Sequence, residues 1–166
     1  MATIKQFFDA FNLVLPSTGF AQMDTVQGTN FPIPVLAFDQ TADEAAFAIF
    51  SPVGYGSGNL DVDIDWYADT ASSGVVRWGV SLAAITPDAD TQDIETKAFA
   101  TEQTVDDTHL GTTNQRLHRA TVSLSNLDSI AEGDWCVLRI RRIGSDAADT
   151  MTGDALLAGV KIAYAD

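Results

Sequence analysis

Alternation of apolar and polar residues is the feature that most constrains how this chain can fold. In the segment 59–68, NLDVDIDWYA, apolar residues occupy every second position from Leu60 and aspartates fill the positions between them. Side chains two apart lie on the same face of a β-strand, so this period turns one face to a core and the other to water. An α-helix repeats every 3.6 residues and would scatter both sets around its axis.

Seven further segments have strand-like patterns of varying strength. The eight expected strands are 31–38, 44–50, 59–68, 75–84, 94–102, 116–124, 135–143 and 155–164. Pro32 and Pro34 make the first an edge or entry strand. Turns rich in Asp, Gly, Ser and Thr separate the segments, and no helices alternate with them. The pattern predicts an all-β fold, an antiparallel two-sheet sandwich of jelly-roll type.

The same alternation predicts which side chains form the core. Trp66 and Trp78 share faces with aliphatic residues, so we expect both rings inside. The residues of segments 135–143 and 155–164 expected on inward faces are Cys136, Leu138, Ile140, Leu156, Ala158, Val160, Ile162 and Tyr164. Trp135 lies at a strand start and is the best candidate for an exposed ring that could stack on a sugar.

Residues 1–30 follow a different pattern from the rest. Apolar side chains recur at helical spacing at Ile4, Phe7, Phe8 and Phe11, and Pro16 ends the run. We therefore expect a short amphipathic helix, with an extended arm as the alternative, and a connecting loop up to residue 30. The chain divides on this basis into an N-terminal arm, 1–30, and a sandwich domain, 31–166.

The apolar N-terminal stripe has two possible uses. Its phenylalanines either cover the end of the domain's own core or dock on another chain. A sandwich closed by two sheets has no obvious need for the stripe. We therefore assign Ile4, Phe7, Phe8 and Phe11 as partner-binding residues.

Charge excludes several partners. The chain has 23 acidic and 9 basic residues and a net charge of −14. Such a surface repels nucleic-acid phosphates and anionic membranes, so neither is an expected partner. The single cysteine, Cys136, cannot form an intramolecular disulfide.

Asp61, Asp63 and Asp65 form a row of carboxylates on one strand face. A calcium site is one interpretation, but Trp66 stands where a calcium-binding EF-hand loop needs glycine. The others are a solvated face, or cross-strand ion pairs with Arg139 and Arg141, which alternate in the same way. We favour these two, so we expect no metal and no cofactor.

No other group of residues predicts catalysis. His109 is expected in a loop and His118 on a strand surface, and neither lies in a catalytic motif. The aspartates of the loop SDAADTMTGD, Asp146, Asp149 and Asp154, are expected to hydrogen-bond their own backbone. The sequence therefore predicts a binding or structural protein and not an enzyme.

Two long segments carry a resemblance to a known family. They are NLDVDIDWYADTASSGVVRWGVS and EGDWCVLRIRRIGSDAADTMTGDALLAGVKIAYA, the second joining an arginine-ended strand to a final strand through an Asp-rich loop. Together they resemble the jelly-roll domains of tailed-phage virion proteins, found in capsid cement or decoration proteins and in tail fibres. The first thirty residues lie outside the resemblance.

The resemblance implies a structural role in a virion. The protein would be made in the host cytoplasm and would sit on the capsid surface as a cement protein, with the major capsid protein as partner and a trimer as its own assembly. The alternative is a carbohydrate-recognition, receptor-binding domain of a tail fibre.

Overall fold

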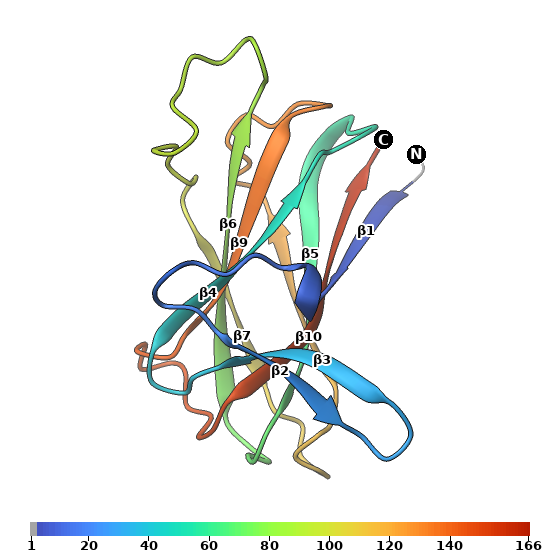
Figure 1. The fold of residues 1–166 in the computed structure, drawn as a ribbon, viewed down its shortest axis with the longest axis vertical. Helices are drawn as coiled ribbons and strands as arrows, with labels where there is room; N and C mark the ends of the chain where they lie inside the picture. The colour runs from blue at the N-terminus through green and yellow to red at the C-terminus, as the bar shows by residue number, and fades with distance from the viewer. Residues whose placement is uncertain (1–2) are drawn as a thin grey trace.

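The computed structural model describes residues 3–166, and all its paired strands are antiparallel (Figure 1). The elements are β1 (Thr3–Asp9), η1 (Ala10–Asn12, a 3-10 turn), β2 (Gln22–Gln27), β3 (Pro32–Phe38), β4 (Asp43–Phe50), β5 (Ser57–Ala68), β6 (Val75–Ile85), β7 (Gln103–Thr108), β8 (His118–Leu124), β9 (Trp135–Ile143) and β10 (Ala155–Ala165). They form two sheets, which confirms the predicted jelly-roll type of sandwich. Over residues 3–166, no helix is long and apolar enough to cross a membrane.

The larger sheet has six strands and the smaller has four. The six-stranded sheet runs β2-β3-β10-β5-β8, with β1 also paired to β10, and the four-stranded sheet runs β4-β9-β6-β7. β10 organises the larger sheet, because β5 follows one side of it while β3 and then β1 share the other. The start of β1 consequently lies beside the end of β10, with Thr3 paired to Ala165 (Figure 1).

The inward faces of both sheets form one core, as the alternation predicts. Trp66 of β5 and Trp78 of β6 are fully buried, with ring centroids 6.3 Å apart. Their strands add the buried aliphatic residues Leu60, Val62, Ile64, Val76, Val80 and Leu82. Each such side chain stabilises the fold by roughly 1.5–3 kcal/mol.

The predicted N-terminal helix is wrong and the extended alternative is correct, because residues 3–9 form β1 and the helical part is limited to η1. Ile4 and Phe8 are four residues apart, a spacing that puts both on one face in a helix and in a strand alike. In the strand both pack against the core, and the odd-numbered neighbour Phe7 points outward. Pairing with the open edge of β10 satisfies the backbone of β1.

Part of the expected connecting loop is also a strand. β2 pairs with β3 along its whole length, so the expected boundary at residue 30 falls in the turn of a hairpin. Figure 1 shows this hairpin extending from the body of the sandwich. The sequence hides β2 because QMDTVQ is polar and mostly exposed.

Residues 94–102 do not form the expected strand, since β7 begins after them. They belong to a long loop that covers the outer face of the four-stranded sheet. The ring of Phe99 lies 6.0 Å from that of Phe47 and beneath the guanidinium of Arg139, which is 4.9 Å from its centroid. Glu102 lies against Gly79, where an added Cβ would come within 2.7 Å of its carboxyl carbon.

A β-bulge changes which residues of β10 face the core. Its register against β5 shifts between Leu157 and Gly159, so Leu157 and Val160 both point inward. Leu156 and Ala158, predicted on the inner face with Val160, therefore lie outside the main core. Leu156 joins a second, smaller apolar cluster with Val35 and Tyr67.

Candidate functional site

The outer face of the six-stranded sheet carries the row of β5 side chains that the period-two pattern directs away from the main core. Asp61, Asp63 and Asp65 continue, at the same spacing, into Tyr67. The row gives this face two chemically different parts. One end is apolar around Tyr67, and the rest is lined by charged and hydroxyl groups.

The charged part is a set of cross-strand ion pairs. The Arg119 guanidinium of β8 binds Asp65 through both carboxylate oxygens, with Nε–Oδ1 at 2.6 Å and Nη2–Oδ2 at 2.7 Å. Asp63 accepts a hydrogen bond from Thr121 Oγ1 at 2.8 Å and forms an ion pair with Lys161 of β10. The side chain of Arg119 is 51% exposed, so it remains available to a ligand.

Arg139 and Arg141, the predicted partners of this row, belong to the other sheet. Arg141 holds Glu102 with Nε–Oε2 at 2.7 Å and Asp43 with Nη1–Oδ2 at 3.2 Å, and Arg139 binds Glu102 at 3.2 Å. The predicted pairing of Asp61, Asp63 and Asp65 with them is therefore wrong. The alternation shows which residues share a strand face, but the sheet assignment comes from the tertiary fold.

The environment of Asp63 favours its charged form. Burial alone would raise the pKa of its carboxyl group. Hydrogen bonds from Lys161 and Thr121, with the charges of Lys161 and Arg119, outweigh burial and lower that pKa below the ordinary 3.8. Across residues 3–166, no group of three or more His, Cys, Asp or Glu side chains is placed to hold a metal ion.

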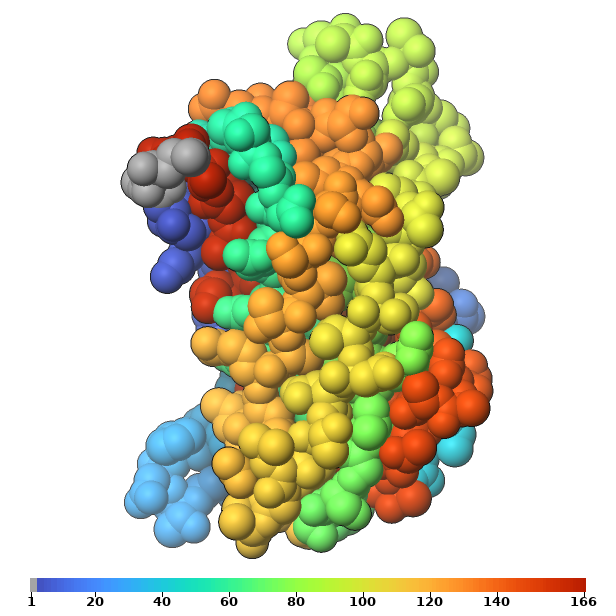
Figure 2. All heavy atoms as spheres, turned by 180° about the vertical axis from the view of Figure 1, so that it is seen from behind, coloured from blue at the N-terminus to red at the C-terminus, as the bar shows by residue number. Residues whose placement is uncertain are grey.

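The apolar part of the face is a cleft of about 420 Å³ between the β2–β3 hairpin and the chain leading into β8. Phe31 at the hairpin tip and Leu117 before β8 are 67% and 62% exposed. The remaining lining residues are Val26, Gly28, Ile33, Tyr67, Gln115 and Ala158. Figure 2 shows the light-blue hairpin projecting beside the golden chain around residue 115, with a hollow between them.

Tyr67 brings a polar group to this mainly apolar cleft, which Gln115 also lines. Its ring packs with Val35 and Leu156, where the bulge in β10 has brought Leu156 to the outer face. Its hydroxyl is buried and has no hydrogen-bond partner within residues 3–166. Burial, with the nearby charges of Asp69 and Asp24, raises the pKa of this phenol. A buried hydroxyl without a partner is costly, so a ligand that bonds to it gains affinity.

The structure separates the four predicted partner-binding residues. Ile4 and Phe8 pack against the core, whereas Phe7 is 63% and Phe11 49% exposed. The Phe7 ring lies over Gly159, because a Cβ there would come within 2.5 Å of the ring. Phe7 pairs in register with Lys161, and it therefore adds an exposed aromatic ring beside the charged part of the outer face.

The other residues considered from sequence have mainly structural surroundings. Trp135 is only partly exposed and lines an apolar groove beneath the loop that covers the four-stranded sheet. His118, expected on the surface, is buried, as is His109. His118 lies opposite Trp66 in the strand pair, which turns its side chain inward.

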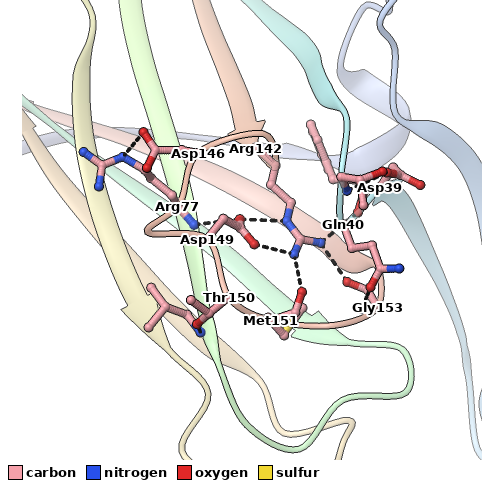
Figure 3. Close-up of polar contacts among 12 residues, drawn as sticks. Asp39, Gln40, Arg77, Arg142, Asp146, Asp149, Thr150, Met151 and Gly153 are labelled. Carbon is pink, nitrogen blue, oxygen red and sulfur yellow. Dashed lines mark hydrogen bonds and ion pairs between the residues drawn. The ribbon is translucent and has the colours of Figure 1, made fainter.

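The Asp-rich loop before β10 is organised by Arg142 (Figure 3). Asp149 of the loop accepts from Arg142 Nη2 at 2.7 Å and Nε at 2.9 Å. Arg142 also donates to the carbonyl oxygens of Met151, Gly153 and Phe38. Arg142 thus ties the loop to β3 from inside the protein, and we assign it no ligand.

Reasoning from sequence missed the residues that complete the site: Phe31, Tyr67, Leu117, Arg119 and Lys161. Tyr67 had a usable signal, because it extends the aspartate row at the same period. Phe31 and Leu117 had none, since a turn and a loop bring them together from distant parts of the chain.

Comparison with solved structures places this fold beside carbohydrate-binding modules. The chain is similar to a family 11 module from Clostridium thermocellum in complex with a β-1,3-1,4-mixed-linked tetrasaccharide, at TM-score 0.52 and 11% identity over 97% of this chain and 96% of that one. It is also similar to the family 11 module of the Clostridium thermocellum cellulase Lic26A-Cel5E, at TM-score 0.51 and 10% identity over 98% and 95%.

A third similar structure is a non-crystalline cellulose specific module, CBM28, at TM-score 0.50 and 9% identity over 93% of this chain and 88% of that one. No protein-family model matches the chain, and no curated protein matches its sequence. At these identities the likeness shows a shared β-sandwich fold. The similar structures do not connect the chain with a phage capsid.

Proposed function

We propose that this protein is a non-catalytic carbohydrate-binding domain that holds a neutral glycan along the outer face of its six-stranded sheet. The observation that carries the proposal is the continuity of the apolar cleft around Tyr67 with the ion-paired row beside it. A sugar ring has apolar C–H faces and a rim of hydroxyl groups. A ligand site of this kind needs apolar and aromatic surface together with a few fixed polar groups.

Each part of the face has a role in this proposal. The Phe31 ring of the β2–β3 hairpin, and the Phe7 ring of β1 further along the same edge of β10, offer exposed aromatic surface for stacking. The Tyr67 ring lines the cleft, and its buried, unpaired hydroxyl becomes available to a ligand that displaces the side chains covering it. Arg119 and Asp65 hold each other in a fixed geometry, so their remaining donors and acceptors are oriented before a sugar arrives.

The dimensions suit an extended ligand. Three steps of two residues separate Asp61 from Tyr67, and each step covers roughly 7 Å, so the row is about 20 Å long. This length accommodates several sugar units in a line. The fold shared with modules that bind oligosaccharides or cellulose supports the same interpretation.

Charge selects neutral over acidic glycans. The net charge of −14 repels carboxylated or sulfated chains at low salt. On this face the cations Arg119 and Lys161 already neutralise Asp65 and Asp63. The charges of these cations are therefore already compensated, which weakens their attraction for an acidic sugar.

The carboxylates of the face favour binding over hydrolysis. Glycoside hydrolysis by a carboxylate pair requires one carboxyl group to stay protonated as the acid, through a raised pKa. The pKa of Asp63 is lowered instead, and Asp65 is held by two nitrogens of the Arg119 guanidinium. Asp63 is therefore not suited to donate a proton near neutral pH, and both oxygens of Asp65 are occupied by Arg119.

The proposal agrees with the tail-fibre alternative considered from sequence, in which the domain recognises a carbohydrate. The cement role, the trimer, the major capsid protein as partner and the virion location stay predictions from the resemblance. They would require an assembly surface, for which the exposed Phe11 is a remaining candidate.

Titration with glycans tests the proposal. Mixed-linked β-glucan, non-crystalline cellulose and mannan are the neutral probes, and a sulfated polysaccharide is the acidic one. We expect binding to at least one neutral probe and none to the acidic probe. NMR shift changes on binding should concentrate on β5, β8 and the β2–β3 hairpin.

A pair of arginine variants locates the site. Arg119→Met removes the exposed guanidinium of the outer face, and we expect about a tenfold loss of affinity or more, the value of one charge-assisted hydrogen bond. Arg77→Met is the matched control, because Arg77 forms a surface ion pair with Asp106 on the other sheet, at 3.1 Å. No binding to any neutral probe, or equal affinity for both variants and wild type, would overturn the proposal.

A further inference from the structure

A buried pair of histidines lies next to the cleft and plays no part in the proposed binding. His109 and His118 have ring centroids 4.5 Å apart, and His118 stacks on Trp66 at 4.7 Å. The two residues are 4% and 5% exposed. They enclose the ends of the loop 110–117, and this loop carries Gln115 and Leu117 into the cleft wall.

Both rings hold this loop by accepting hydrogen bonds from its backbone. The Leu110 N–H donates to His118 Nε2 at 2.9 Å, and the Gly111 N–H donates to His109 Nδ1 at 3.0 Å. A ring nitrogen that accepts a hydrogen bond carries no proton. The opposite nitrogen of His109, Nε2, then donates to the Asn114 carbonyl oxygen at 3.0 Å. The loop geometry thus specifies two uncharged imidazoles.

The loop depends on these bonds because its backbone is otherwise unfavourable. Gly111 and Thr112 both have a φ of 73°, and Thr112 is a β-branched residue in the left-handed region. Such a residue persists only where its surroundings hold it in place. Without the hydrogen bonds from the Leu110 and Gly111 N–H groups, the two residues before Thr112 would no longer be held in place.

The charged groups around His118 act in both directions. Burial lowers the pKa of its ring below the ordinary 6.5, and the neighbouring His109 lowers it further. Arg116, in the same loop, also lowers it through its charge, whereas Asp107 of β7, which accepts from Trp66 Nε1 at 2.8 Å, raises it. His118 is therefore mostly uncharged at neutral pH, and it takes up its proton below pH 6.5.

We propose that His109 and His118 form an acid-sensitive latch: protonation of the pair breaks its hydrogen bonds to Leu110 and Gly111, releases the loop 110–117 and weakens binding at the cleft. A proton on His118 Nε2 would oppose the Leu110 N–H, and two charged rings at this separation would repel each other. The effect on ligand affinity rests on the proposed function. The release of the loop does not.

Backbone amide hydrogen exchange of the whole chain between about pH 8 and pH 5 tests the latch directly. After correction for the intrinsic pH dependence of exchange, we expect the amides of Leu110 and Gly111 to lose at least tenfold in protection on the acid side. Core amides such as those of Ile64 and Ile140 should stay protected. Imidazole NMR signals should show protonation in the same pH range.

His118→Gln separates the latch from general acid damage. A glutamine oxygen can still accept from the Leu110 N–H but takes up no proton in this range, so the acid-induced opening should be lost or reduced. Unchanged protection of Leu110 and Gly111 while the rings become protonated would overturn the latch. The wild-type measurement decides the question even if the variant fails to fold.

The two proposals fail separately. If acid opens the loop but no glycan binds at any pH, the latch stands and the proposed function falls. If a neutral glycan binds with the same affinity across the range and the loop stays protected, the function stands and the latch falls. If both hold, affinity should fall roughly tenfold or more as the loop opens.

Discussion

Arg142 and Asp149 form a bidentate ion pair inside the protein, with both side chains 0% exposed. Because the arginine also donates to three backbone carbonyl oxygens, its charge is compensated on several sides (Figure 3). A buried charge is tolerated only with such partners. This pair explains why an arginine stands next to the last residue of β9, in front of an Asp-rich loop.

Replacing Arg142 by methionine should destabilise the protein by about 3–5 kcal/mol, because Asp149 would be left buried and unpaired. The free energy of unfolding in urea measures the loss. Arg119→Met is the matched control, since its ion pair is half exposed and should contribute no more than about 1 kcal/mol. Similar losses in the two variants would contradict the structural role of Arg142.

Phe31→Ala should weaken glycan binding without changing the fold. Phe31 lies at a hairpin tip and is 67% exposed, so its removal should change stability by about 0.5 kcal/mol or less. Losing an aromatic ring from the cleft should reduce affinity about tenfold, as calorimetry can show. Phe11→Ala is the control, because Phe11 is also exposed but does not line the cleft. Equal affinities for both variants would rule out a stacking role for Phe31.

Tyr67→Phe should lower glycan affinity, and it should leave the stability of the free protein unchanged or raise it. The variant removes a buried hydroxyl that has no partner within residues 3–166, so the free protein should be as stable as wild type or more stable by up to about 1 kcal/mol. Glycan affinity should fall about fivefold to tenfold if a sugar hydroxyl uses this group. Thermal unfolding measures the change in stability, and a binding titration on the same samples measures the change in affinity. A clear loss of stability would mean that the hydroxyl already has a partner.

Asp63→Asn should be destabilising at neutral pH and nearly neutral in acid. The pKa of Asp63 is lowered below 3.8 in the folded protein, so its contribution is present above that pH and is lost as pH falls through the lower folded value. We expect a penalty of about 1–3 kcal/mol near pH 7 that shrinks below pH 3.8. Urea unfolding at several pH values measures it, with the exposed Asp61→Asn as control. A penalty that is independent of pH would exclude the charge of Asp63 as its source.

The sequence identified the strand faces better than the strand partners. Period two placed Trp66 and Trp78 in the core correctly, because burial repeats along a strand whatever its neighbours are. It could not say that Arg119 and Lys161, and not Arg139 and Arg141, lie beside the aspartate row. Cross-strand contacts depend on strand order, and strand order comes from chain segments far apart in sequence.

Local patterns also failed where two structures share one spacing. Ile4 and Phe8 fit a helix and a strand equally, and pairing with β10 decided for the strand. The bulge between Leu157 and Gly159 interrupts an alternation that continues unbroken in the sequence, and it moves Leu156 to the outer face. That one shift supplies part of the apolar cluster around Tyr67.

By itself, then, the sequence determined an acidic, all-β sandwich, because composition and the period of burial are properties of short segments. The candidate site was decided only by the tertiary structure. Phe31, Tyr67 and Leu117 come from a hairpin tip, a central strand and a loop, and the packing of these elements puts them around one cleft. Long-range packing also buries His118 against Trp66 and places the latch beside that cleft.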